Sequence, residues 1–145
     1  MVVDFELELV WIPVSDVDRA KRFYLEQAGF DLLVDIPNGL PGQRIVQVTP
    51  PGSACSIGFG DGDNPVKSGS QQGLFIVADV FAARDELAAR GVKVGEVQHI
   101  VDGAWVPGPA PDRADYMSFV EFSDPDGNTW LLQERRGRPS TPTGR

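Results

Sequence analysis

One pattern occurs twice in this chain of 145 residues: a short apolar strand, an aspartate, an amphipathic helix and a closing glycine. The first copy contains Asp16 and Gly29, and the second contains Asp79 and Gly91. The two aspartates are 63 positions apart and the two glycines are 62 apart, so the frame is kept almost unchanged. A pattern that recurs at a fixed spacing is the signature of a repeated structural unit. The sequence therefore predicts two units of similar size, each with one helix.

Hydrophobic periodicity predicts the same order of elements in both halves of the chain. A strand at 7–12 precedes a helix at 15–28 in the first half, and a strand at 73–77 precedes a helix at 79–90 in the second. Each helix is followed by three segments with strand character, separated by Pro and Gly turn signals. These expected strands are 31–35, 44–49 and 55–59 in the first half, and 92–100, 117–123 and 129–133 in the second.

Local signals indicate where the parts begin and end. Ser15 with Asp18 three residues later has the spacing of a capping box at the first helix, and Asp16 adds favourable negative charge there. A stretch rich in Gly, Asp and Ser separates the halves, and the C-terminal end is polar. We predict one domain over residues 5–135, with units at 5–60 and 72–135, a linker at 61–71 and a disordered tail at 136–145.

Composition excludes several classes of partner. The chain has 13 Lys and Arg against 21 Asp and Glu, and residues 1–134 alone carry a formal charge of −12 because four arginines follow them. This negative charge repels the phosphates of nucleic acid. No apolar run approaches the roughly 20 residues of a membrane-spanning helix. The single cysteine, Cys55, is expected to be a small buried hydrophobe. We expect a cytoplasmic protein without nucleic-acid or membrane partners.

The repeated frame resembles the vicinal oxygen chelate superfamily, which includes glyoxalase I, bleomycin resistance proteins and extradiol dioxygenases. The resemblance is carried by residues 14–16 (Val-Ser-Asp), residues 77–79 (Val-Ala-Asp) and above all residues 122–130 (Phe-Ser-Asp-Pro-Asp-Gly-Asn-Thr-Trp). It implies an α+β fold in which two βαβββ units form a curved mixed sheet around a cup. The Asp-Pro-Asp-Gly-Asn segment itself has the composition of a hairpin turn and carries no chemistry.

The resemblance also implies where metal ligands would stand, because metal-using members take them from the first and last strands of each unit. The first-strand positions fall on Leu9 and Gln72, and the last-strand position of the second unit falls on Leu131. The last strand of the first unit, 55–59, offers at best a thiol. A hard divalent ion needs several oxygen or imidazole ligands. We therefore expect neither a metal ion nor another cofactor.

The same frame implies an apolar cup that takes a small molecule. Strand alternation places Leu9 and Trp11 on one face, assigned to the cup, and directs Trp130 toward the helix layer. A large apolar wall with a few polar groups is the usual form of a small-molecule site. The candidate ligand-binding residues are Leu9, Trp11, Gln72, Leu74, Trp105, Tyr116, Thr129, Leu131 and Gln133.

Residues 103–115 contain three prolines and no periodicity, which predicts a long loop without strand or helix. One interpretation is a semi-rigid lid that places Trp105, with Arg113 or Tyr116, over the cup. The alternative is a surface loop held in place because Trp105 packs on its own domain.

Two titratable residues are candidates for catalysis. His99, the only histidine, is either a general base at the rim of the cup or a partly exposed residue near the end of a strand. Glu121 either enters the cup with an altered pKa or lies on a solvated edge.

These observations leave three functions open. The first is a metal-independent binding protein of the bleomycin-resistance type, which sequesters an aromatic or cationic compound. The second is an enzyme, either a glyoxalase-like lyase or dioxygenase, or a metal-free acid–base catalyst that uses His99 and Glu121. The third is an interaction subunit with a vestigial cup.

We also expect a homodimer, because two units in one chain leave strand edges and apolar surface exposed.

Overall fold

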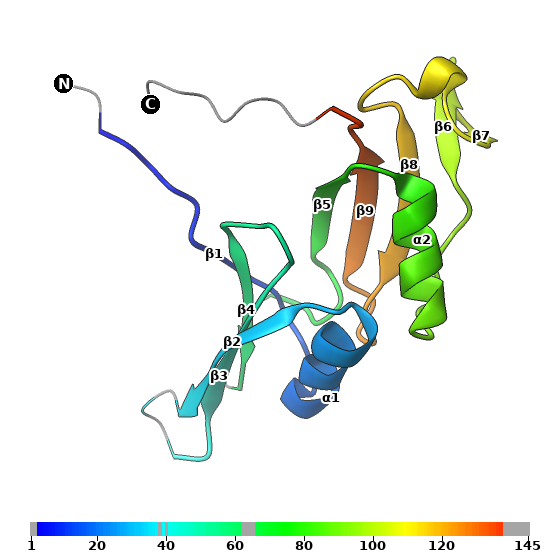
Figure 1. Cartoon of the computed structure of the whole chain (residues 1–145). Helices are drawn as coiled ribbons and strands as arrows, with labels where there is room; N and C mark the ends of the chain where they lie inside the picture. The colour runs from blue at the N-terminus through cyan, green and yellow to red at the C-terminus, as the bar shows by residue number, and fades with distance from the viewer. Residues whose placement is uncertain (1–2, 38, 40, 62–65, 138–145) are drawn as a thin grey trace. The chain divides into compact units, whose positions relative to one another are not determined.

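The computed structural model of the chain (Figure 1) describes residues 3–37, 39, 41–61 and 66–137. These residues form two compact units. Unit 1 comprises the described residues up to Gln71 together with Asp124–Asn128, and unit 2 comprises Gln72–Ser123 and the described residues from Thr129 onward. Residues 62–65 of the predicted linker and 138–145 of the predicted tail lie outside the described residues.

Unit 1 has a four-stranded mixed sheet in the order β1-β4-β3-β2, in which β1 pairs parallel to β4 and the other pairs are antiparallel. Its helical segment begins as an α-helix and ends as one turn of π-helix. The elements are β1 (Leu9–Trp11), α1 (Val17–Arg22), η1 (Phe23–Gln27), β2 (Asp31–Pro37), β3 (Arg44–Thr49) and β4 (Ser56–Gly60).

The first helix is capped by Asp16, which corrects the expectation that Ser15 is the capping residue. Asp16 has extended backbone angles directly before Val17, and its carboxylate accepts a hydrogen bond from the backbone N–H of Arg19 over 3.0 Å. Only the residue next to the first helical position can cap in this way. The backbone N–H and hydroxyl of Ser15 instead donate to the carboxylate of Asp126.

The core of unit 1 lies between the helix and one face of the sheet. Tyr24 on the helix is completely buried and packs against the ring of Phe59 on β4, with ring centroids 5.7 Å apart. Val46 and Val48 on β3 are completely buried on the same side. Among the described residues, no helix lies on the opposite face of this sheet, and we call that face the open face of unit 1.

Unit 2 has a five-stranded mixed sheet in the order β5-β9-β8-β6-β7 (Figure 1), in which only β5 and β9 pair parallel. The side chain of Asp79 caps its helix by accepting hydrogen bonds from the N–H groups of Phe81 and Ala82. The elements are β5 (Gln72–Val77), α2 (Val80–Ala89), β6 (Gln98–Val101), β7 (Ala104–Pro107), η2 (Pro111–Arg113), β8 (Ser118–Ser123) and β9 (Thr129–Glu134).

Two sequence predictions in unit 2 are wrong. The strand expected at 92–100 begins only at Gln98, apart from one isolated bridge at Val94. The loop expected at 103–115 contains strand β7 and a short 3₁₀ turn. Asp102 and Gly103 join β6 to β7 with φ angles of 49° and 79°. Positive φ at both central residues is the geometry of a two-residue hairpin turn, for which Asp-Gly is a favoured sequence.

The Asp-Pro-Asp-Gly-Asn segment turns the chain between β8 and β9, yet it belongs to unit 1. Its carboxylate at Asp124 is buried and accepts hydrogen bonds from the backbone and side-chain N–H groups of Asn128. The Asn128 amide also donates to the carbonyl of Pro13 over 2.9 Å. The segment is therefore part of the packing of unit 1.

The prediction of an α+β fold is confirmed: each unit combines a mixed sheet with one helix packed on it. Unit 1 has the expected βαβββ order, and unit 2 adds one strand, β7, to that order. Among the described residues, no helix has the length and apolar character that crossing a membrane requires.

Candidate functional site

The sheet of unit 2 brings five of the predicted binding residues together on one face. Directly opposed residues of paired strands project to the same side of a sheet, and the register pairs Gln72 with Thr129, Leu74 with Leu131, and Ile76 with Gln133. Alternate residues on the same strands form the other face. We call the face that carries Leu74 and Leu131 the open face of unit 2, because α2 packs on the other side.

The opposite face of this sheet is the core side. Trp130 is 4% exposed there and stacks on Phe75 with ring centroids 4.7 Å apart, as the alternation predicted. A Cβ on Gly73 would stand only 2.2 Å from the Trp130 ring, so glycine is required at that position. Leu132 is also buried on this side. The alternation along β9 thus separates core residues from open-face residues cleanly.

Trp105 lies on the open face of unit 2. It belongs to strand β7 of the sheet and not to the loop that the sequence predicted. The register of β6 places Ile100 opposite Trp105, and Gln98 opposite Phe119 of β8. Trp105 reaches across β6 and meets the ring of Phe119 edge to face, at a centroid distance of 5.3 Å. Half of its surface remains exposed. The sequence pattern does not reveal this aromatic pair, because it predicts a loop over 103–115 where the structure has strand β7.

Arg113, the residue proposed to accompany Trp105 in a lid, points to the core side. Its guanidinium binds the carboxylate of Glu134, which is completely buried, and also contacts Asp79 at 3.3 Å. The Glu134 carboxylate accepts a further hydrogen bond from the N–H of Val80 at the start of α2. Hydrogen bonding by Arg113 lowers the pKa of Glu134, and the same bond raises the pKa of Arg113. This cluster fastens the 103–115 segment to the helix.

Tyr116 lies beside the end of β9. Its carbonyl accepts a hydrogen bond from the side-chain amide of Gln133 over 3.0 Å, and its hydroxyl accepts one from Arg135 over 3.1 Å. The Arg135 guanidinium also lies over the Tyr116 ring. Tyr116 thus adjoins Gln133, another predicted binding residue, and nearly half of its surface is exposed.

The structure does not bring His99 and Glu121 together. His99 is paired with Ser118 of β8, which is completely buried on the core side, and its Nδ1 is 2.8 Å from the carbonyl oxygen of Gly108. Glu121 is paired with Leu131, so it projects from the open face. Residues on opposite faces of one sheet cannot share a proton-transfer site.

The open face of unit 1 carries Leu9 and Trp11. Parallel pairing places Leu9 opposite Ser56 and Trp11 opposite Gly58, just as it places Gln72 opposite Thr129 in unit 2. A Cβ on Gly58 would meet both Leu9 and Trp11 at 3.1 Å, so the missing side chain makes room for them.

That register identifies the position in unit 1 that corresponds to Leu131. Leu131 is paired with the residue two places after Gln72, and Gly58 is paired with the residue two places after Leu9. Gly58 has no side chain to bind a metal ion. Cys55, the thiol considered earlier, precedes β4 and is only half-buried, which corrects the expectation that it is a buried hydrophobe.

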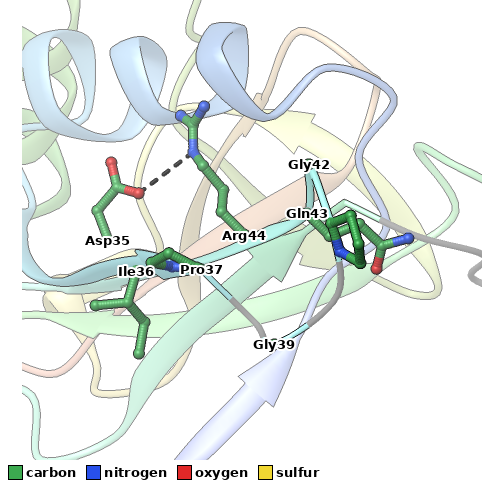
Figure 2. A pocket seen from close by; sticks show the side chains of 8 residues that line it. Asp35, Ile36, Pro37, Gly39, Gly42, Gln43 and Arg44 are labelled. Atoms are coloured by element: carbon green, nitrogen blue, oxygen red, sulfur yellow. Dashed lines mark ion pairs between the residues drawn. The ribbon is translucent and has the colours of Figure 1, made fainter.

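Across the described residues, no three His, Cys, Asp or Glu side chains gather in a group that could hold a metal ion. A cavity of about 630 Å³ does lie at the β2–β3 connection of unit 1 (Figure 2). Its charged groups contact one another: Arg44 lies 3.3 Å from Asp35 and also binds Asp18, whose pKa it lowers. None of the predicted binding residues lines this cavity.

Comparison with known proteins gives consistent results. The protein YetH of Bacillus subtilis (strain 168), described as uncharacterized, is 28% identical over 134 residues, which cover 89% of this chain and 98% of YetH. The solved structure of TnmS3, an antibiotic binding protein from Streptomyces sp. CB03234, is 36% identical with a TM-score of 0.70, covering 92% of this chain and 98% of TnmS3.

A second solved structure from Streptomyces sp. CB03234 is described as a glyoxalase/bleomycin resistance protein. It is 37% identical, with a TM-score of 0.67, and the match covers 89% of this chain and all of that chain. The model of the Glyoxalase/Bleomycin resistance protein/Dioxygenase superfamily matches residues 6–132. With this match over most of its length and the βαβββ order of its elements, the chain belongs to the Glyoxalase/Bleomycin resistance protein/Dioxygenase superfamily.

Proposed function

We propose that this chain is a metal-independent binding protein that sequesters a small aromatic or cationic compound on the open faces of its sheets. One observation carries the proposal: of the four positions at which metal-using relatives hold ligands, three have no side-chain donor atom and the fourth is Gln72. Leu9 and Leu131 have hydrocarbon side chains, and Gly58, which corresponds to Leu131 in the strand register of unit 1, has no side chain. Gln72 alone is too weak a ligand for a divalent ion.

The character of the two faces supports an aromatic ligand. Trp11 and Trp105 are each about half exposed, and exposed aromatic rings are costly unless something covers them. The open face of unit 2 also carries a small number of polar groups, Gln72 on β5 and Thr129 and Gln133 on β9. Apolar walls with a few polar groups are typical of small-molecule sites.

Charge and relatives support the same class of function. The formal charge of −12 over residues 1–134 attracts cations and repels anions. Two structures more than 35% identical to this chain are described as an antibiotic binding protein and a glyoxalase/bleomycin resistance protein. Binding a compound without converting it requires no catalytic residue or cofactor in addition to these faces.

We also propose that the chain acts as a homodimer. Each sheet ends in edge strands, β1 and β2 in unit 1 and β5 and β7 in unit 2, which can pair further. Leu7 and Leu74 expose more than half of their surface. Two-fold association would cover such apolar surface.

The proposal is tested by mass spectrometry of the purified full chain under native conditions, together with metal analysis after dialysis. We expect a co-purifying organic compound that leaves on denaturation, and zinc, iron, manganese and nickel far below one per chain. Stoichiometric metal that is lost in Gln72→Ala would overturn the proposal and favour a lyase or dioxygenase.

Matched variants separate the open face from other exposed surface. Leu74→Asp places a charge on the open face of unit 2, and Val101→Asp places one on the opposite side of the same sheet at similar exposure. We expect the co-purifying compound to be lost from the first variant and retained by the second. Equal retention in both variants would contradict binding on this face.

A further inference from the structure

One charged group stands on β8, the central strand of the open face of unit 2, among apolar and neutral polar side chains. Glu121 is exposed and lies opposite Leu131, which in turn lies opposite Leu74. Its carboxylate has no hydrogen-bond or ion-pair partner among the described residues. A carboxylate beside an apolar side chain such as Leu131 gains from any cation that binds next to it, and the gain increases once a ligand displaces water from the face.

An aromatic platform lies directly beside this carboxylate. Phe119 precedes Glu121 by two residues on β8, so the two side chains project from the same face about 7 Å apart along the strand. The ring of Phe119 is held edge to face by Trp105. A planar ring system that stacks on this pair can therefore extend a substituent as far as the carboxylate.

We propose that Glu121 is the residue that selects the ligand by charge, and that the ligand is a planar aromatic compound bearing a protonated nitrogen. This inference rests on the proposed binding function and deepens it. In this proposal Trp105 and Phe119 bind the aromatic ring of the ligand, and Glu121 binds its cationic group. The ligand is therefore both aromatic and cationic. Glu121 has a binding role here and needs no partnership with His99.

Arg135, a charged group near this face, is already engaged. Arg135 donates a hydrogen bond to the hydroxyl of Tyr116 and lies over its ring. It follows Leu131, the partner of Glu121, by four residues and lies just past the end of β9, which separates the two positions by about 13 Å. Arg135 therefore neither neutralises Glu121 nor blocks the approach of a cation to it.

The test uses two flat tricyclic probes of similar size, proflavine, which is a cation at neutral pH, and acridone, which is neutral. Binding of each probe to the full-length protein is titrated by fluorescence at low salt. The variant is Glu121→Gln, which keeps the shape of the side chain and removes its charge. The control is Glu26→Gln in unit 1, where an exposed glutamate without a side-chain partner among the described residues undergoes the same change of charge.

We expect proflavine to bind more tightly than acridone, and Glu121→Gln to weaken proflavine by about three- to tenfold while leaving acridone unchanged. Glu26→Gln should alter neither probe, which excludes a general effect of net charge. Saturable binding of both probes that Glu121→Gln leaves unchanged overturns the role of Glu121 alone. If neither probe binds the wild-type protein, both this inference and the proposed binding face are contradicted.

Discussion

Tyr24 donates a hydrogen bond to Asp124 over 2.7 Å, although the two residues are 100 positions apart and both are buried. The acceptor belongs to the Asp-Pro-Asp-Gly-Asn turn, and the donor belongs to the helical segment of unit 1. Asp124 also accepts hydrogen bonds from the backbone N–H groups of Asp126 and Asn128. A segment that reads as a simple turn is thus a buried polar centre of unit 1.

The first prediction concerns this hydrogen bond. Tyr24→Phe should lower the free energy of unfolding by about 1–2 kcal/mol, because it removes one partner from a buried carboxylate without leaving a large cavity. Equilibrium urea denaturation measures the effect. Tyr116→Phe, at a half-exposed tyrosine, serves as the control and should change stability by less than about 0.5 kcal/mol. Equal effects of the two variants would mean that the buried bond contributes nothing.

The second prediction concerns pH and the ion pair between Glu134 and Arg113. The pKa of Glu134 is lowered in the folded protein, chiefly by the hydrogen bond from Arg113. A lowered folded-state pKa adds stability above the unfolded-state pKa, and this stability is lost as the pH falls through the folded-state value. Between about pH 6 and about pH 3 the wild-type protein should lose more stability than Glu134→Gln does.

A control and a second variant make the pH experiment decisive. Glu96→Gln removes an exposed glutamate paired with Arg84, and it should keep the wild-type pH dependence. Arg113→Met should cost about 3 kcal/mol at neutral pH, because it leaves the Glu134 carboxylate buried without its partner. Identical pH profiles for the wild type and Glu134→Gln would refute the assignment.

The third prediction concerns Trp105 as a binding anchor. Trp105→Ala should weaken binding of the co-purifying compound by roughly 1–3 kcal/mol, with little change in melting temperature because half of the ring is exposed. Trp105→Phe should retain most of the affinity, since it keeps an aromatic ring near Phe119. A large loss of stability with unchanged affinity would instead assign Trp105 a purely structural role.

The fourth prediction concerns assembly. Light scattering at micromolar concentration should give a mass close to twice the 15.7 kDa of one chain. If the units are exchanged between chains, the interface should exceed the roughly 1,200–2,000 Å² of a standard contact and resist dilution. A mass near that of a single chain would refute the dimer.

Much of the architecture could be read from local patterns. The 63-residue spacing of Asp16 and Asp79 predicted two units, and alternation along β9 separated Trp130 from Leu131. The hairpin between β6 and β7 could also have been predicted from the sequence, because Asp102-Gly103 is a strong turn signal. The three prolines that follow it in residues 103–115 favour a loop instead, and they led to the wrong prediction.

The sequence by itself determined the order of elements in unit 1 and, except for β7, in unit 2, since this order depends on local periodicity and on spacing within a repeated frame. The tertiary structure decided which side chains meet. Strand register put His99 and Glu121 on opposite faces and placed Gly58 in correspondence with Leu131. It also paired Tyr24 with Asp124. Such pairings depend on contacts between residues far apart in the chain, which periodicity within one strand or helix does not encode.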